Sequence, residues 1–137
     1  MTIALDASVV VAALVDSGSN GSWAESVIAD GAPVAPELVR VEATNILRRL
    51  ERSRDISSLE ATSSHRDLMR LDMELYPFAP FAERVWALRD NLPAYAAWYV
   101  ALAEALECPL ATLDLKLRRA SGPTCEFIVP TGASSRP

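Results

Sequence analysis

The sequence is poor in histidine and cysteine, and this scarcity excludes several kinds of chemistry. Its single histidine, His65, lies among polar residues on a predicted surface helix, which argues against acid–base catalysis by an imidazole. The two cysteines, Cys108 and Cys125, form at most one disulfide, and neither has another cysteine or a histidine at zinc-like spacing. We therefore interpret both as small buried hydrophobic residues and assign them no chemistry.

Long hydrophobic runs are also missing. The longest apolar runs, such as the one from Val9 to Val15, are far shorter than a membrane span, and no basic segment followed by a cleavable apolar stretch opens the sequence. We therefore expect a cytoplasmic protein that has no membrane contact.

Positive charge is in deficit, with 13 lysines and arginines against 18 acidic residues and a net charge of −5. Tight, non-specific DNA binding is disfavoured, because binding to phosphates rewards a positive field. A nucleic-acid enzyme is not excluded, because carboxylates that hold divalent ions count as negative in the sequence and are neutralised by those ions. The positions of the acids therefore matter more than their sum.

Predicted strands and helices alternate along a chain of 137 residues, half of them hydrophobic, which can close one core. Strands are predicted at 2–5, 33–36, 74–78, 109–112 and 125–129, and helices at 9–15, 23–29, 37–50, 58–73, 82–91, 94–107 and 115–120. This alternation predicts an α/β fold, with a mostly parallel sheet of four to five strands covered on both faces. We expect one domain over 1–130 and a polar tail over 131–137.

Three acidic residues are placed where a parallel sheet gathers functional groups. Asp6 and Asp114 each follow the carboxyl end of a predicted strand, which is where ligand sites form in α/β sheets. Glu42 lies on the helix predicted over 37–50 and can lean toward the same edge. In that helix, four apolar residues are expected to share one face: Leu38, Val41, Ile46 and Leu50.

A few carboxylates from separate elements suit a divalent cation such as Mg²⁺, which prefers oxygen ligands. In metal-assisted phosphodiester cleavage the ion lowers the pKa of a bound water, so no serine or cysteine nucleophile is needed. Each acid also has a simpler interpretation: Asp6 and Asp114 as helix caps, and Glu42 as a solvated helix residue. Taken singly the acids favour the simpler interpretation, whereas their common placement favours a metal site.

Three segments, in this order and spacing, resemble the sequence signature of VapC-type PIN domains: LDASVVVAAL, RVEATNILRRL and NLPAYAAWYVALAEALECPLATLDLKLRRA. The third is the most specific. The resemblance implies a three-layer α/β/α PIN-like domain in which Asp6, Glu42 and Asp114 are the catalytic and metal-binding acids. It also implies supporting roles for three polar residues: Ser8, Asn45 and Thr112.

The same resemblance implies an activity and partners. Similar proteins are metal-dependent endoribonuclease toxins of type II toxin–antitoxin pairs. For this chain the resemblance therefore implies Mg²⁺ or Mn²⁺ as the cofactor, RNA as the substrate, and a homodimer. It further implies a cognate VapB-type antitoxin whose C-terminal segment covers the active site.

One position departs from the family pattern. The family usually has an aspartate directly after the first tyrosine of the third segment, whereas here Tyr95 is followed by Ala96. Loss of one carboxylate predicts weaker metal binding and low nuclease activity at little cost in folding. An inactivating change made to protect an expression host would explain Ala96, and so would a natural variant with lost or altered catalysis. The alternative function is thus a catalytically dead PIN module that binds RNA or its antitoxin.

Basic and aromatic residues have two interpretations each. Trp98 and Tyr99 could stack on RNA bases, but apolar neighbours on their helix favour packing in the core or in a dimer. Eight basic residues fall in two regions that form either a phosphate-guiding rim beside the acids or ordinary solvated helix faces: Arg40, Arg48, Arg49, Arg52, Arg54, Lys116, Arg118 and Arg119.

A small phosphoryl-transfer or receiver-like domain would also place aspartates at strand ends. It would need an acidic pair near Asp6 and a suitably placed lysine. The only lysine is Lys116, which argues weakly against this class.

Overall fold

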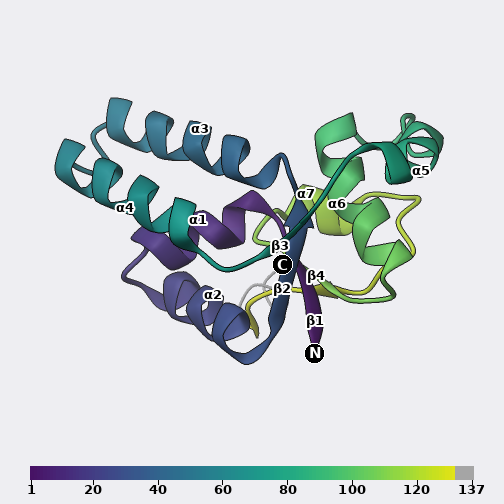
Figure 1. Ribbon diagram of the computed structural model, residues 1–137, viewed down its shortest axis with the longest axis horizontal. Helices are drawn as coiled ribbons and strands as arrows, with labels where there is room; N and C mark the ends of the chain where they lie inside the picture. Colours follow the sequence, from purple (N-terminus) through teal and green to yellow (C-terminus); the bar gives the residue numbers. More distant parts are fainter. Residues whose placement is uncertain (132–137) are drawn as a thin grey trace.

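A five-stranded parallel sheet lies at the centre of the protein (Figure 1). The structure is a computed structural model that describes residues 1–131. The strand order is β3-β2-β1-β4-β5, and every neighbouring pair is parallel. The strands are β1 Thr2–Leu5, β2 Ala32–Pro36, β3 Glu74–Tyr76, β4 Leu110–Ala111 and β5 Phe127–Ile128. This arrangement confirms the predicted α/β class and parallel sheet.

Helices cover both faces of this sheet, as a parallel sheet requires. On one side lie α1 Ala7–Val15, α2 Ser19–Asp30, α3 Val39–Arg52 and α4 Ser58–Arg70, and on the other lie α5 Ala82–Ala87 and α6 Ala94–Ala105 (Figure 1). A short 3₁₀ turn, η1 Ala79–Phe81, precedes α5, and α7 Leu115–Arg119 follows β4. The three layers match the predicted α/β/α architecture.

The central strands and α6 are apolar enough to be buried on all sides. Ile3, Ala4 and Leu5 of β1 are buried, and so is every residue of α6 from Ala97 to Ala103. A helix that is hydrophobic all round belongs inside a protein, and α6 indeed packs against β1, β2 and β4. The first turn of α6 is thereby held beside the carboxyl ends of the central strands.

Three predicted helix boundaries are wrong by three residues or more, and others differ by one or two residues. The helix predicted over 23–29 begins at Ser19. Its first turn lies so close to the Asp16 carbonyl oxygen that a Cβ at position 21 would be 1.8 Å from it, and Gly21 makes this approach possible. The helix predicted over 58–73 ends at Arg70, and Met73 is buried in the segment that follows. The helix predicted over 82–91 ends at Ala87 and continues as turns.

The predicted apolar face of α3 is wrong in one residue, Val41. Val39, Ala43 and Leu47 form the buried stripe, whereas the side chain of Val41 is 66% exposed. Two positions along a helix correspond to about 200° around its axis, so burial of Val39 turns Val41 outward. The partly buried Ile46 and Leu50 lie beside the buried stripe.

Other predictions concern single residues and the chain end. His65 is exposed on α4, Cys108 is buried and Cys125 is half-buried, and both cysteines are free. No helix within residues 1–131 is both long and apolar enough to cross a membrane. Most of the predicted polar tail, residues 132–137, lies outside the described residues.

Candidate active site

Asp6 is fixed at the point where β1 ends. Because Leu5 pairs with Ala111 of β4, the next residues of the two strands, Asp6 and Thr112, lie side by side. The Asp6 Oδ1 atom accepts hydrogen bonds from the Ser8 hydroxyl at 2.5 Å and from the Val9 amide at 3.2 Å. Its Oδ2 atom accepts a hydrogen bond from the Thr112 hydroxyl. Three donors therefore orient one carboxylate.

Burial disfavours the charged form of the Asp6 side chain. The residue is only 6% exposed, and burial raises the pKa of its carboxyl group. Hydrogen bonds from Ser8, Thr112 and Val9 act in the opposite direction, while the nearby charge of Asp114 raises the pKa further. Asp6 is thus a buried carboxylate with a neighbouring acid, which is an arrangement that a bound cation would stabilise.

The two hydroxyls that hold Asp6 also hold the loop after β4. The Ser8 Oγ atom accepts a hydrogen bond from the Leu113 amide at 3.1 Å, and the Thr112 Oγ1 atom accepts one from the Asp114 amide at 2.9 Å. The turn after β1 and the loop after β4 are therefore locked together. This network sets the position of Asp114 relative to Asp6.

Asp114 caps α7 while remaining open to solvent. Its Oδ1 atom accepts hydrogen bonds from the amides of Lys116 at 3.0 Å and Leu117 at 3.3 Å. Asp6 likewise caps α1 through its bond from Val9. The capping interpretation is therefore correct for both aspartates. A cap uses one carboxylate oxygen, so it does not prevent the other from holding a ligand.

Glu42 reaches the site from α3 and is held by a tyrosine of α6. The Tyr99 hydroxyl donates a hydrogen bond of 2.5 Å to the Glu42 Oε1 atom. Tyr99 is 3% exposed, and burial together with this bond to a carboxylate raises the pKa of its hydroxyl. Sequence reasoning assigned Tyr99 to packing and missed this contact. Its position three residues after Ala96, on the same helix face, was the available signal.

One cavity of about 300 Å³ brings the predicted site residues together. Its walls include all three acids and the alanine at the family aspartate position, namely Asp6, Glu42, Asp114 and Ala96, together with Ser8 and Tyr99. Thr112 supports the cavity through Asp6 without lining it. Asn45 is exposed on α3 and lines a neighbouring hollow instead.

The donor set of this cavity suits a hard divalent cation, because carboxylate oxygens are the ligands that Mg²⁺ and Mn²⁺ prefer. The second oxygens of Glu42 and Asp114 receive no hydrogen bond from residues 1–131. Over the same residues, no three histidine, cysteine or acidic side chains lie close enough together to hold one ion. The ligands are thus of the right kind but form a loose group, and Ala96 adds no carboxylate to it.

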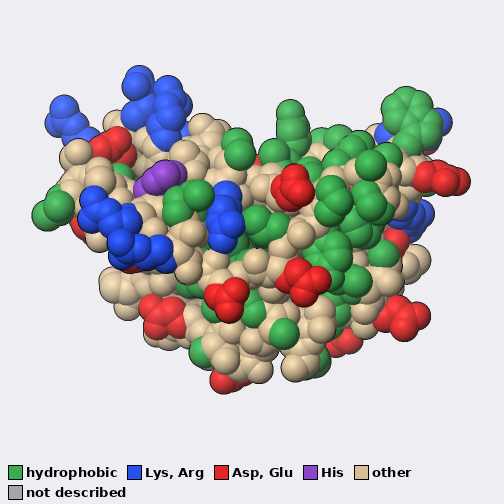
Figure 2. Space-filling view, viewed as in Figure 1, with side chains coloured by type: hydrophobic (Ala, Val, Ile, Leu, Met, Phe, Trp, Pro, Cys, Tyr) green, Lys and Arg blue, Asp and Glu red, His purple; other side chains and the backbone are tan. Residues whose placement is uncertain are grey.

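Of the eight basic residues, Arg40 fits neither the rim nor the solvated-face interpretation. Arg40 donates a hydrogen bond of 2.8 Å to the Leu71 carbonyl, so it ties α3 to the end of α4. Several arginine side chains gather over the ends of α3 and α4 that point away from the sheet (Figure 2). Arg48 lines the hollow beside the acids. Exposed basic residues also follow Asp114 on α7: Lys116, Arg118 and Arg119.

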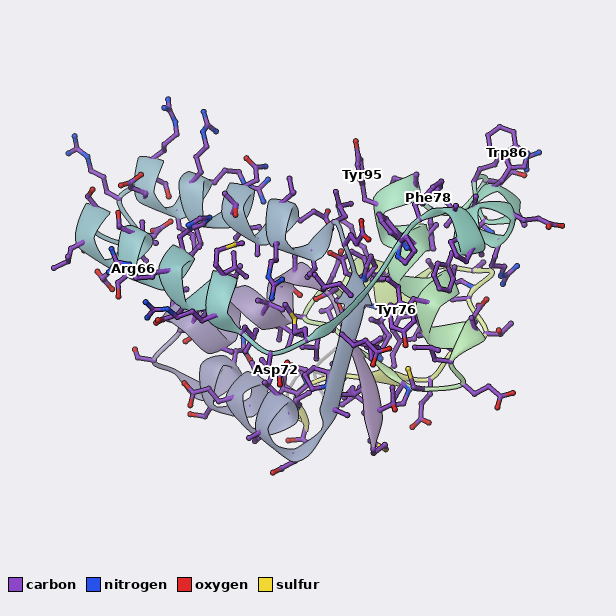
Figure 3. All side chains as sticks on the ribbon, viewed as in Figure 1. Arg66, Asp72, Tyr76, Phe78, Trp86 and Tyr95 are labelled. Carbon is purple, nitrogen blue, oxygen red and sulfur yellow. The ribbon has the colours of Figure 1, made fainter. Side chains whose placement is uncertain are left out.

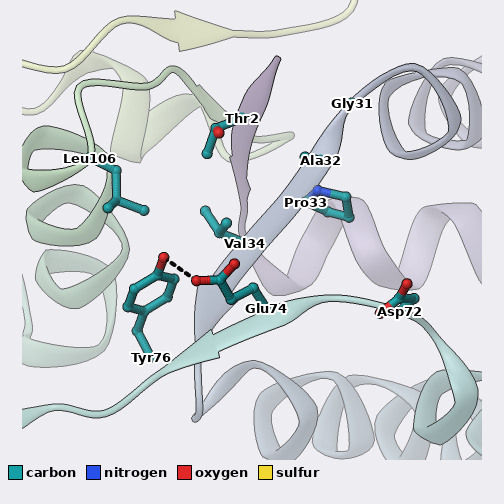
Figure 4. Close-up of a pocket in the computed structure, with 9 residues that line it drawn as sticks. All are labelled: Thr2, Gly31, Ala32, Pro33, Val34, Asp72, Glu74, Tyr76 and Leu106. Atoms are coloured by element: carbon teal, nitrogen blue, oxygen red, sulfur yellow. Dashed lines mark hydrogen bonds between the residues drawn. The ribbon is translucent and has the colours of Figure 1, made fainter.

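A second cavity, of about 390 Å³, lies where β1, β2 and β3 begin. Thr2, Ala32 and Glu74 are among its walls, and the Tyr76 hydroxyl donates a hydrogen bond of 2.5 Å to Glu74 (Figure 4). The candidate site is at the other end of the strands, where β1 and β4 finish. Functional groups of parallel α/β sheets gather at that carboxyl end.

Comparisons with known proteins agree with this fold. The model of the PIN domain family matches residues 3–123. "VapC ribonuclease Mb0985" of Mycobacterium bovis is 38% identical over 127 residues, which cover 93% of this chain and 97% of the relative. The structure of PAE2754 from Pyrobaculum aerophilum superposes with a TM-score of 0.71 at 20% identity, covering 97% of this chain and 95% of that one.

VapBC2 from Rickettsia felis, solved bound to a DNA fragment from its promoter, has a similar fold. It superposes with a TM-score of 0.64 at 16% identity, covering 94% of this chain and 98% of that one. The chain therefore belongs to the PIN domain family, which confirms the resemblance seen in the sequence. The receiver-like alternative is set aside.

Proposed function

We propose that this chain is an endoribonuclease toxin of a VapBC toxin–antitoxin pair that depends on Mg²⁺ or Mn²⁺. The observation that carries the proposal is the convergence of Asp6, Glu42 and Asp114 on one cavity from three separate elements. The 38% identity to a protein named as a VapC ribonuclease, over nearly the whole length of both chains, supports the same activity.

Asp6, Glu42 and Asp114 would hold the cation through their carboxylate oxygens. When bound, the ion supplies an activated water and stabilises negative charge on the phosphate. The chain's own contribution is to position those acids. Ser8 and Thr112 keep Asp6 oriented although it is buried, and Tyr99 holds one oxygen of Glu42 so that the other can face the cavity.

Ala96 leaves the acidic group one carboxylate short of the pattern that the family resemblance implies. It is half-buried and lines the cavity that contains the three acids. An aspartate at this position would add a fourth carboxylate to the residues that line the cavity. We therefore expect the chain as it stands to bind metal weakly and to cleave RNA slowly.

The proposal includes the partners that a VapC-type toxin implies: a VapB-type antitoxin, an RNA substrate and a second copy of the chain. An enzyme that acts on cellular RNA would work in the cytoplasm. The alternative function, a catalytically dead module that binds RNA or antitoxin, is favoured by Ala96 alone. The ribonuclease and the dead module would use the same cavity. They differ in one expected result, because Ala96→Asp should restore RNA cleavage only if the chain is a ribonuclease.

Expression in a bacterial host tests the proposal. We would induce the chain as given, Ala96→Asp, and Ala94→Asp, which adds a carboxylate at an exposed position of α6 outside the cavity. Ala96→Asp alone should arrest growth and create new 5′ ends in cellular RNA, and adding Asp114→Asn should abolish both effects. Intact RNA and normal growth with a well-folded Ala96→Asp protein would contradict the proposal. The same effect from Ala94→Asp would show that added charge, and not the site, is responsible.

A further inference from the structure

A second hollow adjoins the candidate active site and has no role in the proposed chemistry. It has a volume of about 560 Å³, within the range of roughly 300–1,000 Å³ that is usual for small-molecule sites. Glu42 and Tyr95 line both this hollow and the cavity that contains the acids. A molecule whose reacting group lies at the acids would therefore extend into the hollow.

Tyr95 is the aromatic wall of the hollow. Trp98 and Tyr99 on the same helix are buried, whereas the ring of Tyr95 is 61% exposed. Figure 3 shows it standing out between α3 and α6. Folding leaves this ring uncovered beside the acids. An exposed aromatic ring in such a place offers a surface on which a flat base can stack.

The opposite wall is built by α3 and is apolar where it faces solvent. Leu38 is half-buried, and Val41 is the residue that the sequence wrongly placed on the buried face. Neither helix packing nor a neighbouring loop covers Val41. Tyr95 and Val41 thus give the hollow two apolar sides that come from the two helical layers.

Polar groups on α3 complete the hollow. The Thr44 hydroxyl donates to the Arg40 carbonyl at 2.7 Å, so it is occupied within its own helix. Asn45 and Arg48 are exposed and carry donors that suit a base edge and a phosphate respectively. An apolar slot with one amide and one guanidinium matches a nucleotide better than it matches a purely apolar ligand.

From this arrangement we propose that the hollow binds one nucleotide of single-stranded RNA next to the bond that is cleaved. Its base stacks on Tyr95, and Arg48 pairs with a neighbouring phosphate. The proposal rests on the proposed ribonuclease function and adds to it a binding site for one unpaired nucleotide of the substrate. A base that is paired in a duplex could not enter, because both of its faces are already stacked.

Binding is measured by fluorescence anisotropy with a fluorescein-labelled RNA of mixed sequence, either single-stranded or annealed to its complement. The chain as given is the parent protein, because Ala96 is expected to limit cleavage during the titration. Tyr95→Ala should weaken single-strand binding by roughly fivefold or more, the scale of one lost base–aromatic stack. Tyr95→Phe keeps the ring and should bind like the parent. Arg48→Gln should weaken binding and reduce its salt dependence.

Trp86→Ala is the matched control, because Trp86 is an equally exposed aromatic residue on α5 that lines neither cavity. It should leave binding unchanged. The proposal is overturned if the parent does not bind the single strand, if it binds the duplex equally well, or if Tyr95→Ala binds like the parent. If Tyr95→Ala weakens only the complex with an antitoxin, the hollow is a protein site instead.

A cleavage assay in the Ala96→Asp background separates this proposal from the proposed function. If Ala96→Asp cleaves RNA and adding Tyr95→Ala changes nothing, the nucleotide site is wrong and the ribonuclease stands. If Ala96→Asp does not cleave any RNA, the ribonuclease proposal fails whatever Tyr95 does. Slower cleavage by Ala96→Asp with Tyr95→Ala, and normal cleavage with Tyr95→Phe, is the expected result.

Discussion

The hydroxyl of Tyr99 lies 2.5 Å from the Oε1 atom of Glu42 and joins the two helical layers at the carboxyl end of the sheet. Tyr99 comes from α6, which packs on one face, and Glu42 comes from α3 on the other. Because Tyr99 is buried and its pKa is raised, it remains a neutral donor. Glu42 is therefore a positioned carboxylate and not a freely solvated one.

Replacing this tyrosine should affect metal binding more than folding. Tyr99→Phe keeps the buried ring and removes only the hydroxyl, which contributes about 1 kcal/mol to stability. With Glu42 no longer held, we expect weaker Mn²⁺ binding and slower RNA cleavage in the Ala96→Asp background. Calorimetric titration with Mn²⁺ and thermal unfolding measure the two effects separately. Unchanged Mn²⁺ affinity would show that Tyr99 only packs.

Thr112 should contribute to stability through the Asp6 network. Thr112→Val has nearly the same shape but leaves the buried Asp6 carboxylate and the Asp114 amide each without one partner. An unsatisfied buried polar group costs about 1–3 kcal/mol, so urea unfolding should show a loss of that size. Thr112→Ser keeps the hydroxyl and is the control, and it should lose clearly less. Equal losses in the two variants would mean that packing, and not hydrogen bonding, matters at this position.

The buried charge of Asp6 should lower the stability of the fold while being required for RNA cleavage. Its carboxylate is buried at a cost in solvation, so Asp6→Asn should raise the melting temperature at neutral pH in the presence of a chelator. The same change in the Ala96→Asp background should abolish RNA cleavage. Differential scanning fluorimetry and a cleavage assay test both parts. A variant with a lower melting temperature would show that the three donors fully offset the burial of the charge.

Glu104 should make the fold sensitive to acid. Burial by itself would raise the pKa of Glu104, but hydrogen bonds from Arg84, at 2.6 and 3.1 Å, and from Thr124 lower it below its ordinary value of 4.5. A lowered pKa contributes stability above that ordinary value, and the contribution is lost as the pH falls through the folded-state pKa. Arg84 is 39% exposed, so the contribution is modest, roughly 0.5–1 kcal/mol.

Glu104→Gln removes this dependence while keeping an acceptor for Thr124. The parent should be the more stable protein near pH 7, and the two unfolding free energies should converge as the pH falls through the lowered folded-state pKa of Glu104. Urea unfolding across this range measures the difference. A difference that stays constant with pH would show that the charge of Glu104 makes no contribution.

The sequence predicted the parts of the site that depend on strand ends. Asp6 and Asp114 follow short apolar strands, and the carboxyl ends of parallel strands meet at one edge whatever the details of packing. Ser8 and Thr112 were named from the family resemblance, and their hydrogen bonds to Asp6 agree with a supporting position.

What the sequence did not predict depends on which face of a helix is buried. Val41 was placed on the buried face of α3 because an apolar residue fits a helical pattern there, but Val39 packs inward and turns Val41 out. The Tyr99 contact required knowing that α6 and α3 meet across the sheet edge. Asn45 lies beside the cavity and not in it for the same reason. Such facts follow from the packing of distant elements and not from local patterns.

The most direct measurement is RNA cleavage by purified Ala96→Asp protein, compared with the chain as given, in Mg²⁺ or Mn²⁺ and then with a chelator. Our account predicts that Ala96→Asp cleaves RNA, that the chelator stops it, and that the unmodified chain is far slower. Equal activity of the two proteins would contradict the role assigned to position 96. Cleavage that survives the chelator would contradict a metal site built from Asp6, Glu42 and Asp114.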